Sequence, residues 1–487
     1  MKTAMKTAAV DCRPLGELGA LGELAHVLIV IAAAKSLPAE LPGRDQFVAA
    51  LARKGSKPDE LAKTPLSVDT PQGQRIALLM AAPGLPRFER LVRLRKALAA
   101  LLEESPKALA IHAADAVWAD DACYVALLGG ALLPAQKRET RKPLARIHLH
   151  SPLRPADVAR TEAVAAGNCL ARELTALPHN VLTPTAYRRR IRDLAAATGL
   201  EHEEFDFAAL RKMGAGAFCA VAQGSPQRDA AIVHLRWRPR GKARRRVALV
   251  GKGICFDTGG MNLKTARYMQ NMHEDMGGSA VALGLLQACA RRNLPIAIDA
   301  WLAIARNHLS PQAYAQSDVV TALDGTTIEV VHTDAEGRMV LADALTMAVR
   351  ARPAPDLVID FATLTGSMVV ALGTRHSGVF ASEPDLAAHA VEAGASSGER
   401  VVVLPMAQDY DAALESKVAD TLQCTMDGEA DHILAARFLQ RFVDGRPWLH
   451  VDLSAVNCKG GLGAVGTDLT GFGVAWGADL LDRWMGS

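Results

Sequence analysis

His332-Thr333-Asp334-Ala335-Glu336-Gly337-Arg338 is the stretch on which the fold and chemistry of this sequence depend. The β-branched residues at 327–331 predict a strand before it, and the apolar spacing at 339–345 predicts a helix after it. In an extended segment alternate side chains share a face, so we expect Asp334 and Glu336 to point the same way, with Cα atoms roughly 6–7 Å apart. Two such carboxylates can share a pair of divalent ions, although an acidic turn that caps a helix gives the same pattern.

A second stretch adds further ligand types. A predicted buried strand at 247–250 runs into a glycine-punctuated loop that holds Lys252 and Asp257. Lys264 follows, and Asp275 opens a run of small residues typical of a helix start. Carboxylates gathered in apolar, glycine-rich surroundings repel one another unless cations neutralise them. Oxygen ligands suit Mn, Mg, Co or Zn, so these residues predict a divalent metal site.

The stretches at 251–278 and 332–345 resemble the signature regions of the leucyl aminopeptidase (cytosol aminopeptidase) family. That family has the pattern Lys-Gly-x-x-x-Asp-Ser/Thr-Gly-Gly, then Asp-Met-Gly-Gly, then Asn-Thr-Asp-Ala-Glu-Gly-Arg. Similarity extends from about Leu170 to the C-terminus, through 223–225, 362–366 and 470–473. The resemblance implies a two-metal aminopeptidase that removes the N-terminal residue, leucine or a similar one, from peptides.

The resemblance also implies a ligand set of five residues. Asp257 and Glu336 would bridge two divalent ions, with Lys252 and Asp275 completing one site and Asp334 the other. A lysine can bind a metal only as the neutral amine, so the ions must stabilise its deprotonated form against an ordinary pKa of about 10.4. The expected ions are Zn or Mn, with Mg or Co as further candidates.

Five more positions match functional positions of the family. Lys264 would polarise the scissile carbonyl and its oxyanion, while Arg338 would position an anion such as bicarbonate that serves as the general base. Met272, Thr363 and Gly366 match positions that line the pocket for the first side chain of the substrate. The resemblance therefore assigns both the chemistry and the substrate pocket to named residues.

Several residues depart from the family pattern. His332 replaces the usual Asn, and Thr265 stands where Pro is common. His273 and Glu274 replace a more usual basic or aromatic pair, and residues 306–310 lack the usual Asn-Met-Pro. These departures bear on substrate preference and metal affinity more than on the reaction, because the positions expected to carry the chemistry are filled.

The length of 487 residues favours two domains. Strands are expected at 28–31, 76–80, 109–111, 231–234, 247–250, 296–305 and 356–360, and helices at 87–102, from 124, and at 156–176, 191–197 and 280–291. These patterns predict a smaller N-terminal α/β domain (1–154), a linker helix (155–177) and a larger C-terminal catalytic α/β domain (178–487), whose mixed sheet is flanked by helices. The N-terminal domain lacks a cluster of chemical residues, which favours a structural or oligomer-forming role, and the resemblance implies a homohexamer.

Charge, apolar runs and cysteine spacing restrict the cellular location and the binding partners that we expect. The formal charge of +3 is spread along the chain, so nucleic acid is not expected as a partner. The apolar run at 26–34 is about half of what a membrane span needs, and residues 1–15 lack the apolar core of a signal sequence. Eight scattered cysteines without a Cys-x-x-Cys pair indicate reduced thiols. We therefore expect a cytoplasmic protein that acts on peptides and does not bind membranes.

Two rival interpretations stay open at this stage. The first is a catalytically idle relative that keeps the fold as a binding or scaffold protein. The second is a serine hydrolase built on Gly394-Ala395-Ser396-Ser397-Gly398, which would require a strand before Ser396 and a helix after it. The G-x-G-x-x-G pattern at 461–466 is not followed at once by a helix, so a glycine-rich loop is expected there and not a dinucleotide site.

Overall fold

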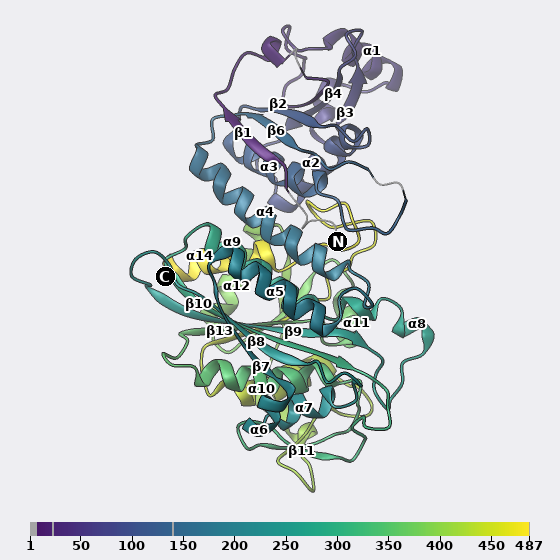
Figure 1. Ribbon diagram of the computed structural model, residues 1–487. Helices are drawn as coiled ribbons and strands as arrows, with labels where there is room; N and C mark the ends of the chain where they lie inside the picture. The colour runs from purple at the N-terminus through teal and green to yellow at the C-terminus, as the bar shows by residue number, and fades with distance from the viewer. Residues whose placement is uncertain (1–6, 22–23, 139–140, 487) are drawn as a thin grey trace. The chain divides into compact units, whose positions relative to one another are not determined.

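The computed structural model describes residues 7–21, 24–138 and 141–486, which divide into two compact units (Figure 1). The first unit comprises Met1–Cys169 with Ala395–Glu399 and Cys458–Thr470, and the second comprises the remainder of the chain. Two short segments of the C-terminal part thus belong to the first unit, which the sequence patterns did not indicate. The predicted domain boundaries at 154 and 178 stay a prediction.

The first unit contains a six-stranded sheet in the order β1-β6-β5-β2-β4-β3. Its strands are β1 (Ala9–Arg13), β2 (His26–Ala32), β3 (Leu66–Asp69), β4 (Arg75–Ala81), β5 (Ala108–Ala113) and β6 (Arg146–His150). Only β3 pairs antiparallel, with β4. The helices are α1 (Arg44–Lys54), α2 (Arg87–Leu102) and α3 (Ala116–Gly130), and α4 (Pro155–Thr175) begins in this unit and ends in the second, which starts at Leu170. The helices predicted at 87–102 and 156–176 are confirmed, as are the three strands predicted in this part of the chain.

The start of α3 was predicted too late. The helix begins at Ala116, eight residues before the predicted start, because the carboxylate of Asp115 accepts the backbone N–H groups of Val117 at 2.9 Å and Trp118 at 3.0 Å. An aspartate in this position satisfies N–H groups that the first helical turn leaves unpaired. The capping residue, and not the later apolar run, sets the boundary.

The second unit is organised around a mixed eight-stranded sheet in the order β15-β14-β17-β13-β9-β10-β8-β7. Its strands are β7 (Glu201–Asp206), β8 (Ala231–Trp237), β9 (Arg245–Asp257), β10 (Ile296–Asn307), β13 (Leu357–Ala362), β14 (Ser377–Ala381), β15 (Val401–Val403) and β17 (Trp448–Asp452). The central strands β17, β13, β9 and β10 are parallel, while β7, β8 and β14 supply antiparallel pairs. The predicted mixed sheet is confirmed, and its parallel centre brings four strand ends to one edge.

Helices cover both faces of this sheet (Figure 1). One face carries α5 (Pro184–Thr198), α9 (Gly277–Arg291), α12 (Pro384–Ser397) and α14 (Val474–Gly486), and the other carries α6 (Phe207–Met213), α7 (Gly216–Ala222) and α10 (Glu336–Arg350). The remaining helices of this unit are α8 (Ala266–Met269), α11 (Gly366–Leu372) and α13 (Asp431–Gln440), and α13 contacts both α10 and α11. Fourteen of the fifteen residues of α10 are buried, because the sheet covers one side of this helix and α7 and α13 pack against its other sides.

The glycine-rich segment after residue 250 is strand and not loop, which corrects the prediction. β9 continues through Lys252 to Asp257. A Cβ at Gly251 would collide with the backbone of Ser279, and a Cβ at Gly253 would lie 2.8 Å from the carbonyl oxygen of Ala303. These glycines therefore serve close packing of neighbouring elements and do not interrupt the strand.

A small three-stranded sheet leads into the stretch at 332–338. It pairs β11 (Val319–Thr321), β12 (Thr327–Glu329) and β16 (Thr421–Leu422). β12 ends at Glu329, and residues 333–334 form a turn before α10 starts at Glu336. The strand-to-helix arrangement is confirmed, but the extended geometry predicted for 334–336 is wrong, because the chain already turns into the helix.

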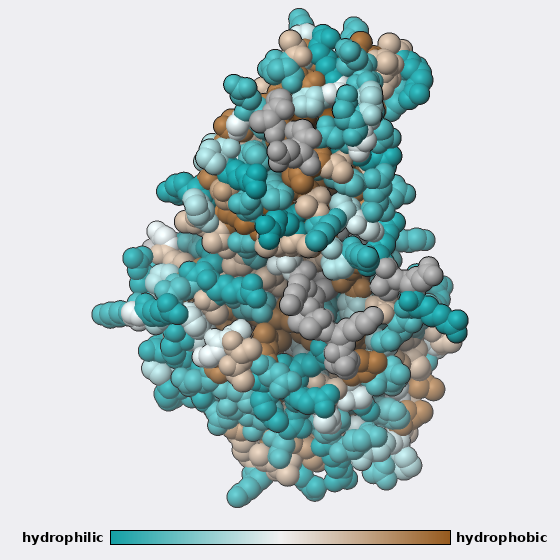
Figure 2. Space-filling model, turned by 45° about the horizontal axis from the view of Figure 1, so that its top comes forward, coloured by the Kyte–Doolittle hydropathy of each residue, from teal (hydrophilic) through white to brown (hydrophobic). Residues whose placement is uncertain are grey.

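Among the described residues, no helix combines the length and apolar character needed to cross a membrane. The face drawn in Figure 2 is largely hydrophilic, with hydrophobic side chains interspersed among polar ones.

Candidate metal centre and active site

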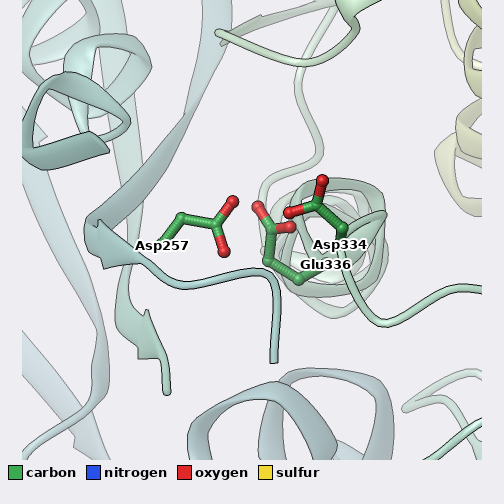
Figure 3. A group of neighbouring side chains, drawn as sticks. All are labelled: Asp257, Asp334 and Glu336. Atoms are coloured by element: carbon green, nitrogen blue, oxygen red, sulfur yellow. The ribbon is translucent and has the colours of Figure 1, made fainter. Parts of the chain in front are cut away.

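Three carboxylates meet at the carboxyl edge of the large sheet (Figure 3). Asp257 is the last residue of β9, Asp334 lies in the turn before α10, and Glu336 is the first residue of that helix. One oxygen from each residue lies within 4.8 Å of the others. The turn at Asp334 aims its carboxylate back at the helix start, so the two acidic groups converge without the extended geometry expected from the sequence.

Lys252 and Asp275 complete the group of five predicted ligands. The Nζ of Lys252 lies 2.8 Å from Oδ1 of Asp275 and 2.8 Å from Oε1 of Glu336. It also donates to the carbonyl oxygen of Thr363 at 2.9 Å. Lys252 projects from the middle of β9, and Asp275 immediately precedes α9, so elements on both faces of the sheet supply the cluster.

Gly337 permits this close approach. A Cβ there would lie 2.7 Å from Cε and 2.8 Å from Nζ of Lys252, well inside ordinary contact distance. Gly337 is in the first turn of α10, where alanine would favour the helix more. Glycine therefore favours the helix less than alanine would at this position, but it leaves the space that the amine of Lys252 occupies.

Burial dominates the electrostatics of the cluster. Desolvation raises the pKa of Glu336 and the pKa of Asp334 to about 7, and the neighbouring carboxylate of Asp257 adds to both shifts. Desolvation likewise raises the pKa of Asp275 to about 6. Burial works to lower the pKa of Lys252, but the carboxylates of Asp275 and Glu336 outweigh it and raise that pKa. The carboxylates therefore need nearby positive charge to remain ionised near neutral pH.

The donor set fits divalent metal ions. Both carboxylate oxygens of Glu336 and Oδ2 of Asp275 are buried and accept no hydrogen bond, although Lys252 lies near Oε1 as an ion-pair partner. Buried carboxylate oxygens without donors are costly unless a cation takes the place of the missing hydrogen bonds. Carboxylate oxygens with one amine suit Mn, Zn, Mg or Co.

Lys264 and Arg338 border the same cluster. The Nζ of Lys264 lies 3.0 Å from Oδ2 of Asp257 and 2.5 Å from Oδ1 of Asp334. Arg338 is buried, and it donates from Nη1 to the carbonyl oxygen of Gln423 at 3.1 Å and from Nη2 to Oδ1 of Asp431 at 2.6 Å. Its Nε is buried without a hydrogen-bond partner. Of the two cations predicted from the sequence, Lys264 thus contacts two of the carboxylates directly, whereas Arg338 pairs with Asp431 and lines the same cavity.

A cavity of about 740 Å³ opens onto this cluster. Its lining includes four predicted ligands, both predicted catalytic cations and the three residues predicted to accept the substrate side chain, Met272, Thr363 and Gly366. Glu336 is not among the lining residues; it is 1% exposed and lies behind the others. One cavity therefore gathers residues from strand β9, the start of α10 and the segment after β13.

The family model for the cytosol aminopeptidase family, catalytic domain, matches residues 169–476. The chain belongs to the cytosol aminopeptidase family. The resemblance found in the sequence is thereby confirmed, and it covers the whole cluster of carboxylates. The part of the chain before residue 169 lies outside the match.

Sequence comparison with individual proteins supports membership of this family. The chain is 41% identical over 318 residues to a probable cytosol aminopeptidase of Nitrobacter winogradskyi, an alignment that covers 65% of this chain and 62% of that protein. It is also 41% identical over 324 residues to a probable cytosol aminopeptidase of Methylorubrum extorquens, covering 66% of this chain and 64% of the relative. The chain thus matches less than two thirds of the length of these relatives.

Two solved structures match nearly the whole chain. The bottromycin maturation enzyme BotP in complex with Mn superposes with a TM-score of 0.83 at 32% identity, covering 95% of this chain and all of that one. The leucyl aminopeptidase of Leishmania major in complex with actinonin superposes with a TM-score of 0.82 at 25% identity, covering 98% of this chain and 95% of that one. The two-domain α/β fold predicted from the sequence is confirmed by these aminopeptidase-like neighbours.

Sequence reasoning missed the residues that hold the ligands in place. Asn307 donates from Nδ2 to Oδ1 of Asp257 at 2.8 Å and to the carbonyl oxygen of Thr333 at 2.9 Å. The side chain of Gln423 accepts from the backbone N–H of His332 at 3.2 Å and donates to the carbonyl oxygen of Ala335 at 3.0 Å. Asn307 could have been noticed in the sequence, because it is a polar residue at the end of a long apolar strand. No feature of the sequence around Gln423 indicated its role.

Two features of the sequence take a defined place in the structure. His332, which stands where the family usually has Asn, accepts the backbone N–H of Asp334 on Nδ1 at 3.2 Å, so it supports the ligand turn. Ser396 lies in the last turn of α12 and not between a strand and a helix. The geometry that a serine hydrolase requires is therefore missing at this residue.

Proposed function

We propose that this protein is a two-metal aminopeptidase that hydrolyses the N-terminal residue, leucine or a similar one, from peptides. The observation that carries the proposal is the cluster of Lys252, Asp257, Asp275, Asp334 and Glu336, in which both oxygens of Glu336, Oδ2 of Asp275 and Oδ1 of Asp334 are buried and accept no hydrogen bond. Membership of a family named for this activity supports it. The structure of BotP in complex with Mn supports metal dependence.

In this proposal the five ligands hold two divalent ions, Zn or Mn, with Mg or Co as further candidates. Ions bound there supply Lewis acidity and a nucleophilic water at neutral pH. Asp257 and Glu336 would be shared by the two ions, Lys252 and Asp275 would complete one site, and Asp334 would complete the other. The 2.8 Å approach of Lys252 to both Asp275 and Glu336 supports its place among the ligands.

The remaining residues of the cavity act on the substrate. Lys264 directs its ammonium group at the scissile carbonyl oxygen and stabilises the charge that develops on it. Arg338 orients an anion, such as bicarbonate, that removes a proton from the attacking water. Its buried Nε, which lacks a hydrogen-bond partner, supports a role in binding such an anion. Met272, Thr363 and Gly366 receive the first side chain of the peptide.

The assembly and location belong to the same proposal. A homohexamer in the cytoplasm agrees with the family resemblance and with the absence of a membrane-spanning helix among the described residues. Closed symmetry is the usual arrangement of soluble homo-oligomers. The N-terminal domain then serves assembly. Peptides are the proposed substrates, and the protein has no proposed role in binding nucleic acid or membranes.

A panel of aminoacyl reporter substrates tests the activity. We expect hydrolysis that a chelator abolishes and that added Mn or Zn restores, and no hydrolysis of the same substrates with an acetylated N-terminus. Metal-independent turnover, or none with either ion, would contradict the proposal. The second of these results would favour the idle relative that binds without catalysis.

The ligand assignment has its own test. Glu336→Ala should remove bound metal and activity together while the fold survives, because the bridging carboxylate is lost. Metal content per chain, activity and circular dichroism measured on the same sample separate these outcomes. Full metal content with near-normal turnover would disprove the bridging role.

A further inference from the structure

Glu274 and Asn457 form a polar pair in the wall of the active-site cavity. The Nδ2 of Asn457 donates to Oε2 of Glu274 at 2.7 Å. Both side chains are half-buried, and both line the cavity that holds the carboxylate cluster. The two residues come from segments 183 positions apart, so the fold and not the local sequence brings them together.

A short chain of contacts places this pair beside the proposed side-chain pocket. Thr363, one of the pocket residues, donates from Oγ1 to Oδ1 of Asp275 at 2.7 Å. A Cβ at Gly277 would lie 3.7 Å from methyl groups of both Thr363 and Val456, so these two side chains lie near one another. Glu274 precedes Asp275 in the chain, and Asn457 follows Val456. The pair therefore lies in the same cavity wall as Thr363, next in the chain to residues that contact or approach it.

The chemistry of this wall differs from that of an apolar pocket. Met272, Val369, Thr374 and Val456 line the same cavity and carry no formal charge. Glu274 adds a carboxylate, and the amide of Asn457 helps to orient it through the hydrogen bond to Oε2. A leucine side chain placed against this carboxylate removes water from it and returns no hydrogen bond, which is unfavourable. An ammonium or guanidinium group replaces that water with a charge-assisted hydrogen bond.

We propose that Glu274, oriented by Asn457, determines specificity and favours peptides whose N-terminal residue is lysine or arginine. The inference rests on the proposed aminopeptidase function, since it assigns a substrate class to that same cavity. Glu274 contacts the substrate side chain, whereas Asn457 is a positioning residue that acts through Glu274.

The test compares kcat/KM for lysyl, arginyl, leucyl and methionyl reporter substrates. We expect the wild-type protein to favour the cationic pair, and Glu274→Gln to lower the ratio of lysyl to leucyl kcat/KM by about tenfold or more, the scale of a hydrogen bond to a charged group. Asn457→Leu should lower the same ratio by a smaller factor, because the carboxylate remains but loses the hydrogen bond from Asn457. Thermal midpoints of both variants confirm folding.

Asp427→Asn is the matched control, because Asp427 is another carboxylate that lines the cavity but lies in an exposed loop. If general attraction of cations explains the preference, this variant lowers the lysyl-to-leucyl ratio as much as Glu274→Gln does. That result, or an unchanged ratio in Glu274→Gln, would overturn the inference.

Binding separates this inference from the proposed activity. Calorimetry with lysine amide and leucine amide measures the preference in the presence of Mn even if no substrate is hydrolysed. Tighter binding of lysine amide that Glu274→Gln abolishes supports the inference whatever the turnover. Equal binding of the two amides to the wild-type protein contradicts it, while hydrolysis of any reporter still supports the aminopeptidase.

Discussion

Gly337→Ala tests whether the position of the Lys252 amine is critical. The added Cβ would lie 2.8 Å from Nζ of Lys252, where ordinary contact begins at 3.4 Å, so the amine must withdraw by about 0.6 Å. Leu364 blocks another direction of relief, because its Cδ1 lies 2.8 Å from the same Cβ. A displacement near 1 Å in an active site can cost on the order of 10²-fold in rate, so we expect kcat/KM to fall by roughly 10- to 100-fold.

Stability should respond differently from activity. Alanine favours a helix over glycine by up to about 1 kcal/mol per residue, which offsets part of the strain in the first turn of α10. We therefore expect a nearly unchanged thermal midpoint together with reduced kcat/KM and reduced metal content after dialysis. Gly486→Ala is the control, since it makes the same change in α14 with no atom within 4 Å of the new Cβ. Wild-type activity and metal content in Gly337→Ala would refute the reasoning.

Three further predictions concern the catalytic cation, a buried ion pair and the assembly. Lys264→Ala should lower kcat by roughly 10²–10³, the scale for one lost oxyanion donor, with both ions still bound; loss of metal would show that its role and that of Lys252 are exchanged. Burial works to lower the pKa of His450, but Asp360, 2.6 Å from its Nδ1, raises that pKa. The ion pair of His450 with Asp360 therefore stabilises the folded state fully below the unfolded-state pKa of histidine, about 6.5. This stabilisation is lost as pH rises through the folded-state pKa of His450. The thermal midpoint of the wild-type protein should therefore fall between pH 6 and pH 8 as His450 loses its proton, and His450→Asn should show a smaller fall over the same range. An identical fall in both proteins would contradict this role of His450. Light scattering should give a mass near six chains, and a stable, active monomer would refute the hexamer.

The sequence predicted the strands and most helices because their patterns are local. The apolar run at 296–305 is buried on both sides of β10, and the spacing at 87–102 matches α2. Glycine was the main source of error. In the sequence, Gly251 and Gly253 indicate a loop, but their partners Ser279 and Ala303 are far along the chain, and only the packed structure shows that the glycines permit contact.

The candidate site was predictable in its members and not in its geometry. The stretch at 332–338 contains two of the predicted ligands, Asp334 and Glu336, in a recognisable order, whereas the turn at Asp334 depends on Asn307 and Gln423, which lie outside that stretch. The Glu274–Asn457 pair was equally hidden, because each residue alone is an ordinary polar side chain. Hydrogen bonds between distant segments are set by tertiary packing, which a single sequence does not display.

The two halves of the carboxylate cluster rest on backbones of different stability. β9 is bonded to β10 along most of its length and to β13 over residues 247–251, so its amide hydrogens exchange with solvent only when the whole sheet unfolds. The amide of Asp334 donates only to the ring of His332, at 3.2 Å, and should exchange through local opening of the turn. The half of the site built on β9 is then as persistent as the core, while the half at Asp334 can adjust to ions of different radius without disturbing the sheet.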